Sequence, residues 1–267
     1  MSGVRTLVVG DASILILESV SDEIKQALEE RLAAYCYGRV RADEDPDYYS
    51  FELTVAEFFR LYDNKPDKTK LGLAGELVVH LLLPHGHDHL ESACLYLNKE
   101  EHNVKKGFDL TFRDRNDGGL WYGEVKSGRV TGAQTADDKA RERIGEAERG
   151  LDAMFTSNVE RKRWDAAILD AEAALSGPSA ASVKDLLRAD FKTINQGSPA
   201  KVRALLCAVV MHPFDLSEID AGSGQTLIDG VKSRGRFEDI RILLIQQSDL
   251  ELLIEVLRAS WVQAEAA

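Results

Sequence analysis

Apolar and polar side chains alternate along residues 108–112, and this period of two predicts a β-strand. Residues 120–128 begin with apolar and aromatic side chains that also suit a strand. The segment between them, residues 114–119, is polar and ends in Asp-Gly-Gly, which is typical of a hairpin loop. Antiparallel pairing of the two strands would set Asp109 opposite residues 124–126.

A continuous apolar pattern over residues 71–83 predicts a buried helix that ends before Pro84. Glu76 lies in the middle of this helix, beside the small residues Ala74 and Gly75. A buried carboxylate is costly unless it meets a cation or a metal, so Glu76 is a candidate functional residue. The alternative is that Glu76 lies on an exposed stripe of the helix.

Other periodic segments complete a coarse assignment of elements. Ser21 and the Thr54-to-Glu57 pattern are helix-capping signals, whereas residues 222–224 read as a loop. Residues 202–211 form a long apolar run typical of a central strand. The further expected strands cover residues 4–9, 13–17, 93–97 and 240–246. The further expected helices cover residues 21–35, 54–62, 135–155, 165–175, a short stretch from 182, and 248–262.

The two motif strands bring charged groups together. Side chains alternate along a strand, so Glu124 and Lys126 point to one face and Val125 points to the other. Close carboxylates such as Asp109 and Glu124 repel each other, and a divalent cation relieves the repulsion. Lys126 beside a metal-bound water could stabilise its hydroxide form. A simple ion pair, in which Lys126 neutralises Glu124 or Asp109, remains the alternative.

A second candidate metal site is the sequence Pro-His-Gly-His-Asp-His at residues 84–89. Histidine and aspartate side chains can bind Zn²⁺ or Ni²⁺. However, these residues follow a proline in an expected loop, and no matching Cys or His cluster occurs downstream. The sequence favours an ordinary loop over a metal site there.

The chain has 267 residues and a net charge of −12, which argues against binding nucleic acid with its whole surface. A local basic rim is compatible with that charge, although solvated side chains are the alternative for each member. We therefore expect a partner to supply much of any DNA affinity. The basic residues near the motif strands are Lys99, Lys105, Lys106, Arg113, Arg115, Arg129, Lys139, Arg141 and Arg143.

Several features favour a cytoplasmic protein. No apolar run approaches the ~20 residues that cross a bilayer, and no secretory signal pattern follows Met1. Cys36, Cys94 and Cys207 are too scattered for a disulfide framework or a zinc site, so reduced thiols are expected.

A helix with Glu76, a strand with Asp109 and a strand with Glu124 and Lys126, in this order, resembles the PD-(D/E)xK nuclease superfamily. Phe108 replaces the proline of the family motif. The segments Leu-Ala-Gly-Glu, Gly-Phe-Asp-Leu and Gly-Glu-Val-Lys-Ser are similar, more narrowly, to the nuclease subunit of the Hachiman anti-phage system, HamA.

The resemblance implies an α/β fold: a mixed central β-sheet flanked by helices, with a restriction-endonuclease-like core. It places the core at residues 66–215 of one elaborated nuclease domain. Residues 1–65 would be an N-terminal elaboration, and residues 216–267 would add a strand and a helix. In several branches of the superfamily a glutamine after the Glu-x-Lys strand assists the site, and Gln134 is the candidate here.

The function that the resemblance implies is a Mg²⁺-dependent DNA nuclease in anti-phage defence, with a helicase as partner and Mn²⁺ as a possible substitute ion. The implied metal ligands are Glu76, Asp109, Glu124 and the backbone at Val125, with Lys126 assisting the attacking water. The alternative is a non-catalytic subunit that binds nucleic acid or a partner on a nuclease-like scaffold. The sequence leaves endo- or exonuclease action, RNA cleavage and oligomeric state open.

Overall fold

The computed structural model describes residues 1–97, 107–156, 159–198, 201–249 and 251–265. These residues build one seven-stranded mixed sheet in the order β1-β2-β7-β6-β5-β4-β3. The α/β class and the mixed central sheet flanked by helices are therefore confirmed. The strands are β1 (Val4–Val9), β2 (Ala12–Leu17), β3 (Leu90–Ser92), β4 (Leu110–Asp114), β5 (Leu120–Arg129), β6 (Arg203–Met211) and β7 (Asp239–Gln247).

The centre of the sheet is parallel. Strands β2, β7, β6 and β5 run in the same direction, and Cys207 of β6 lies beside Val125 of β5 and Leu243 of β7. Residues 204–211 are all buried, as expected for a strand covered on both faces. The expectation of a central strand at residues 202–211 is thus confirmed. Antiparallel strands β1, β4 and β3 complete the two ends of the sheet.

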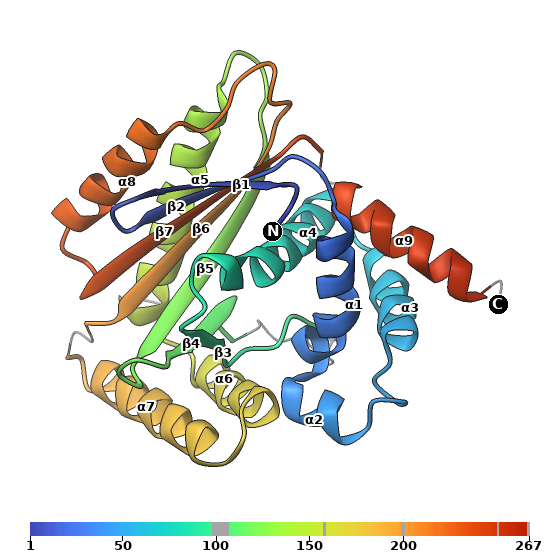
Figure 1. The fold of residues 1–267 in the computed structure, drawn as a ribbon. Coiled ribbons are helices and arrows are strands. Elements are labelled where there is room, and N and C mark those ends of the chain that lie inside the picture. The colour runs from blue at the N-terminus through green and yellow to red at the C-terminus, as the bar shows by residue number, and fades with distance from the viewer. Residues whose placement is uncertain (98–106, 157–158, 199–200, 250, 266–267) are drawn as a thin grey trace.

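Helices cover both faces of this sheet (Figure 1). Helices α1, α3, α4 and α9 pack on one face, and α5, α6, α7 and α8 pack on the other. The helices are α1 (Asp22–Tyr37), α2 (Arg39–Glu44), α3 (Phe51–Tyr62), α4 (Asp67–Leu82), α5 (Ala136–Thr156), α6 (Arg161–Ala174), α7 (Gly177–Asn195), α8 (Ala221–Ser233) and α9 (Glu251–Glu265), with a 3₁₀ turn η1 (Leu83–His85) after α4.

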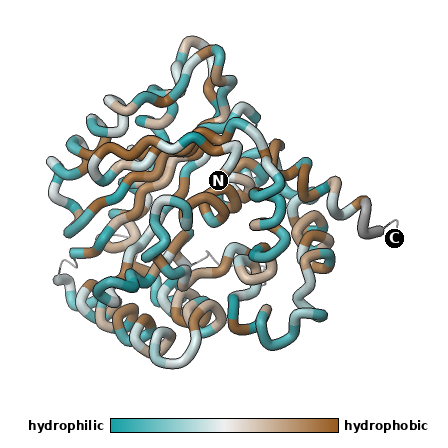
Figure 2. The backbone as a smooth tube through the Cα atoms, viewed as in Figure 1, coloured by the Kyte–Doolittle hydropathy of each residue, from teal (hydrophilic) through white to brown (hydrophobic). Residues whose placement is uncertain are grey.

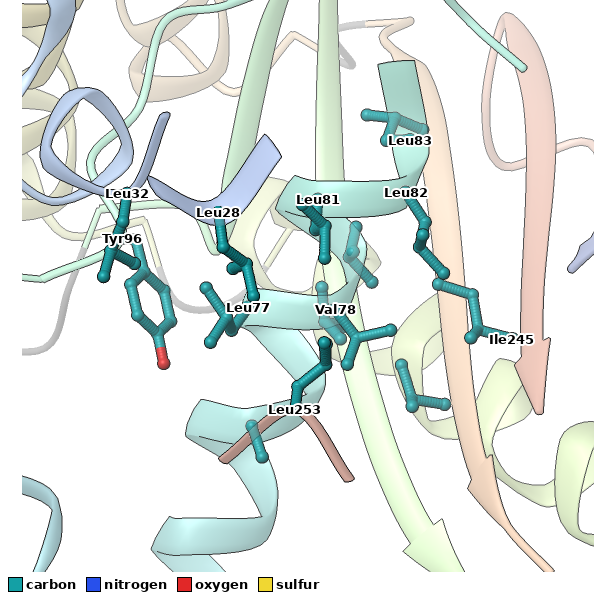
Figure 3. Packing of buried hydrophobic residues seen from close by; sticks show 14 of the residues in the cluster. Leu28, Leu32, Leu77, Val78, Leu81, Leu82, Leu83, Tyr96, Ile245 and Leu253 are labelled. Carbon is teal, nitrogen blue, oxygen red and sulfur yellow. The ribbon is translucent and has the colours of Figure 1, made fainter. Parts of the chain in front are cut away.

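Helix α4 is apolar on nearly all sides because other elements surround it. Leu77 packs beside Leu28 of α1, and Val78 lies near Leu253 of α9, with Ile245 of the sheet close by (Figure 3). Hydrophobic residues likewise concentrate along the central strands in Figure 2. This environment explains why Glu76 is an unusual residue on α4.

Many element predictions are confirmed, including β1, β2, α1, α5 and β7. Ser21 caps α1 by accepting a hydrogen bond from the Ile24 amide at 3.4 Å. Thr135 caps α5 in the same way, with its hydroxyl accepting from the Asp138 amide at 3.2 Å. Short polar residues at these positions satisfy amide groups that a helix start leaves unpaired.

The expected strand at residues 93–97 is wrong. The short strand there is β3, which ends at Ser92, and the Tyr96 amide donates instead to the Tyr35 carbonyl of α1 at 2.7 Å. Tyr96 is fully buried against the helices of that face. Burial against helices therefore produced the apolar pattern that resembled a strand.

Helix starts were placed too late along the chain, and helix α8 was missed. Ser50, not Thr54, caps α3, and the Thr54 hydroxyl donates back to the Ser50 carbonyl at 2.7 Å. Helix α7 begins at Gly177, with a proline in its first turn, rather than at Ser182. Residues 222–224 belong to α8, which Asp220 caps, because capping overrides the low helix propensity of glycine. The expected cap at Ser248 adjoins residue 250, which is outside the described residues.

Among the described residues, no helix combines the length and the apolar character that crossing a membrane requires.

Candidate active site at the open edge of strand β5

Strand β5 has an open edge beyond Gly123. Strand β4 begins at Leu110, which pairs with Gly123, whereas β6 accompanies β5 on its other side as far as Arg129. Residues 124–129 therefore have strand pairing on one side only, within the described structure. Asp109 precedes β4, and its Oδ2 accepts a hydrogen bond from the Val125 amide at 3.1 Å. Asp109 thus lies at the start of the open edge, as the hairpin model predicted.

Glu124 and Lys126 lie on the same face of β5, toward α5. The Lys126 ammonium donates a hydrogen bond to Glu124 Oε1 and lies 3.3 Å from the Val125 carbonyl oxygen. A Cβ atom placed on Gly150 of α5 would lie only 3.0 Å from Glu124 Oε1. Val125 points to the opposite face, into the core around α4. The ion pair that the sequence left open as an alternative is therefore present between Lys126 and Glu124.

The Glu124 carboxyl is nearly enclosed. Its exposed fraction is 4 %, and its Oε2 atom has no hydrogen-bond partner among the described residues. Burial raises the pKa of Glu124 to about 8, with a further increase from the charge of Asp109, although Lys126 opposes the shift. A buried carboxylate oxygen without a donor is costly, so the site has an unmet requirement for a cation or proton at Oε2.

Glu76 completes the charged cluster from the other face of the sheet. A Cβ atom on Gly75 would lie 1.8 Å from Ser127 Oγ, so α4 is tightly apposed to β5 at this point. Burial lowers the pKa of Lys126, but the charges of Glu124, Asp109 and Glu76 outweigh it and raise the pKa above its usual value. Glu76 also raises the pKa of Glu124. The four residues that the motif selected thus interact around one strand edge.

The cluster combines oxygen donors that suit a metal ion with a lysine that now pairs with one of them. In the described part of the chain, no group of three or more His, Cys, Asp or Glu side chains has a metal-binding arrangement. The Lys126 ammonium is the cation that now faces Glu124. The oxygen-rich donor set and the unpartnered Glu124 Oε2 nevertheless suit a hard cation such as Mg²⁺. Metal binding by Glu76, Asp109, Glu124 and Val125 stays a prediction.

Other polar residues near the motif form hydrogen bonds or ion pairs with neighbouring side chains. The Gln134 amide donates to Glu142 Oε2 at 3.2 Å, so its nitrogen serves the start of α5. Arg113 and Arg115 face Glu91 at 3.4 and 3.6 Å. Lys99, Lys105 and Lys106 lie outside the described residues.

The histidine-containing segment at residues 84–89 faces an arginine. The Arg241 guanidinium is 3.4 Å from His87 Nδ1 and also contacts His89 Nε2, and it lies over the Trp121 ring at 4.6 Å from the ring centre. His87 Nε2 lies 3.3 Å from the Ser13 hydroxyl. A guanidinium group, itself positively charged, therefore occupies the position between the two rings where a shared metal would need to sit.

Two glycines contribute to the site and were missed as functional residues. Gly150 leaves room for the Glu124 carboxylate, and Gly128 leaves room for Arg143 of α5, whose Nε would lie 2.9 Å from a Cβ there. For Gly150, the available signal was its placement inside a long helical pattern, where glycine costs stability and indicates close packing.

The fold and site define an α/β protein whose mixed sheet carries a cluster of acidic residues and a lysine at the open edge of one strand. A family model described as HamA matches residues 3–259, so the chain belongs to the HamA family. Membership in this family associates the chain with the Hachiman antiviral defence system. No curated protein matches the sequence.

Proposed function

We propose that this protein is a metal-dependent DNA nuclease, the effector subunit of a defence complex that includes a helicase. The observation that carries the proposal is the convergence of Asp109, Glu124 and Lys126 at the open edge of β5, with the charge of Glu76 acting on the same groups. An extended substrate can reach an open strand edge, whereas neighbouring strands cover the centre of a sheet.

The chain's own residues divide the chemistry among them. Glu124 would hold a Mg²⁺ ion through its Oε2 atom. The other candidate oxygen donors are Asp109, the Val125 carbonyl and Glu76, whose charge acts on Glu124 and Lys126. A bound Mg²⁺ polarises phosphate and acidifies water. Lys126 keeps 31 % of its side chain exposed, so its ammonium can stabilise the negative charge that develops during attack on a phosphodiester.

The acidic balance supports dependence on a partner. A net charge of −12 weakens association with a polyanion, because binding gains from phosphate neutralisation. A helicase that holds DNA would deliver the strand to the site.

The test compares Glu124→Gln and Lys126→Gln with the wild type, in cleavage of plasmid and linear DNA with Mg²⁺. The matched control is Glu172→Gln, which removes a carboxylate from another Glu–Lys pair, formed by Glu172 of α6 and Lys184 of α7. We expect each site variant to lose at least about 100-fold in rate, as for loss of a transition-state contact, and the control to cleave normally. Cleavage at the wild-type rate by both site variants would refute the nuclease proposal.

One observation favours a second candidate, a non-catalytic subunit on the same scaffold: the Lys126 ammonium already donates to Glu124 Oε1. Calorimetric titration with Mn²⁺ distinguishes the two. A heat of Mn²⁺ binding that is present in the wild type and absent in Glu124→Gln supports the metal-dependent enzyme. The absence of Mn²⁺ binding by folded wild-type protein supports the non-catalytic subunit.

A further inference from the structure

A second cluster of charged and polar side chains lies on α5 and on the turn before it, next to the candidate active site. Its members are Gln134, Lys139, Glu142, Arg143 and Glu146. Lys139 is 5 % exposed, and the Lys139 and Arg143 side chains both lie across Gly128 of β5. The cluster therefore borders the same strand that carries Glu124 and Lys126.

Three donors converge on the single carboxylate of Glu142. Lys139 Nζ lies 2.7 Å and Gln134 Nε2 lies 3.2 Å from Oε2, while Arg143 Nη2 donates to Oε1. These bonds, that of Lys139 first, lower the pKa of Glu142 to about 2. Such an arrangement of donors is that of an anion-binding site, occupied here by a side chain of the same helix.

Arg143 pairs with two carboxylates. Its Nη1 also donates to Glu146 Oε2 at 2.7 Å, and its buried Nε meets no acceptor among the described residues. Glu142 and Glu146 keep about a third of their side chains exposed, at 35 % and 34 %, so both carboxylates can turn toward solvent. Lys139 and Arg143 are thus held in place by packing, whereas a bound anion could replace the carboxylates of Glu142 and Glu146.

The position of the cluster fits an extended strand of nucleic acid. Residues 124, 126 and 128 share one face of β5, so Gly128 lies roughly 7 Å beyond Lys126 along the strand. That step is of the same order as the repeat between phosphates in an extended nucleic-acid backbone. A strand with one phosphate at Lys126 would therefore bring another to Lys139 and Arg143.

We propose that Lys139, Arg143 and Gln134 form a second phosphate-binding site for the DNA strand, and that Glu142 occupies this site until a backbone phosphate displaces it. The inference rests on the proposed nuclease function for its ligand, but its own evidence is the donor cluster over Gly128. Glu142 acts as an internal competitor, which limits DNA binding by the protein alone.

The experiment measures binding of a fluorescent single-stranded DNA oligonucleotide to the full chain by anisotropy, at low salt and with EDTA so that cleavage plays no part. We expect Glu142→Gln to tighten binding at least threefold, because the competing charge is gone. We expect Arg143→Gln to weaken it at least threefold and to reduce the slope of log Kd against log salt by about one.

Arg188→Gln is the control, because Arg188 carries the same charge and pairs with Asp185 of its own helix, α7, at 3.1 Å. We expect its Kd to stay within twofold of the wild type. If Glu142→Gln fails to tighten binding, or if Arg188→Gln weakens binding as much as Arg143→Gln, the proposal is overturned. Should Arg143→Gln fold poorly by circular dichroism, Arg143→Lys and the salt slope of Glu142→Gln carry the test.

Inorganic phosphate provides a further arm. If the Kd of inorganic phosphate for the wild type is as low as the Kd of the oligonucleotide, the site binds free anions and the DNA assignment is overturned. The two proposals fail separately. Loss of cleavage in Glu124→Gln with unchanged binding in Glu142→Gln removes only the second site, whereas cleavage by Glu124→Gln and Lys126→Gln at the wild-type rate removes only the nuclease.

Discussion

Gly75 should be essential to the position of α4. An alanine Cβ at Gly75 would lie 1.8 Å from Ser127 Oγ and 2.9 Å from Ser127 Cβ. Rotation of the Ser127 side chain moves Oγ but not Cβ, so the helix or the strand must shift. Such overpacking costs about 1–3 kcal/mol, whereas the better helix propensity of alanine returns only about 1 kcal/mol. We expect Gly75→Ala to lower the free energy of unfolding and to displace the neighbouring Glu76.

Gly72→Ala is the matched control on the same helix, because a Cβ there meets nothing within 4 Å. It should raise the free energy of unfolding by up to about 1 kcal/mol. Urea denaturation measures both variants, and a double-mutant cycle with Ser127→Gly should show a coupling of about 1 kcal/mol or more, since removing the Ser127 side chain relieves the contact. If Gly75→Ala is as stable as Gly72→Ala, the reasoning about the α4–β5 contact is refuted.

Two further predictions concern buried groups. Burial lowers the pKa of His87 from its usual 6.5 to about 4, so the unfolded chain binds a proton that the folded protein rejects, and stability is lost as the pH falls from about 6.5 to 4. At pH 5 this loss is about 2 kcal/mol. Urea denaturation at pH 7 and pH 5 should show it in the wild type and in the control His212→Gln but not in His87→Gln. Equal losses in all three proteins would contradict the assignment. Gly150→Ala should press on Glu124 Oε1, 3.0 Å from the new Cβ, and reduce DNA cleavage several-fold, whereas Gly145→Ala, which meets only the flexible end of an arginine side chain, should cleave normally.

Local signals predicted the parts of the site that lie close in sequence. Alternation placed Glu124 and Lys126 on one face of β5, and the hairpin geometry placed Asp109 at its edge. The apolar run at residues 202–211 identified the central strand because both of its faces are covered. Each of these inferences depends on contacts between neighbouring residues or on burial of a whole element.

Features that depend on distant packing were not predictable. Tyr96 pairs its amide with Tyr35 across more than fifty residues, so its segment only resembled a strand. Arg241, which faces the histidine-containing segment, lies about 150 residues away from it in the sequence. The enclosure of Glu124 depends on Gly150 of α5, and the alternating pattern of β5 does not predict that contact.

The electrostatics of the candidate site follow from this packing. Gly75 brings α4 against Ser127 on one face of β5, and Gly150 brings α5 against Glu124 on the other. The second contact excludes water from the Glu124 carboxyl, and this exclusion leaves Oε2 without a partner and raises the pKa. A larger residue at Gly150 would force the carboxylate outward, where water could solvate it and the need for a cation would decline. The metal site that we propose would therefore depend on the two glycines as well as on the acids.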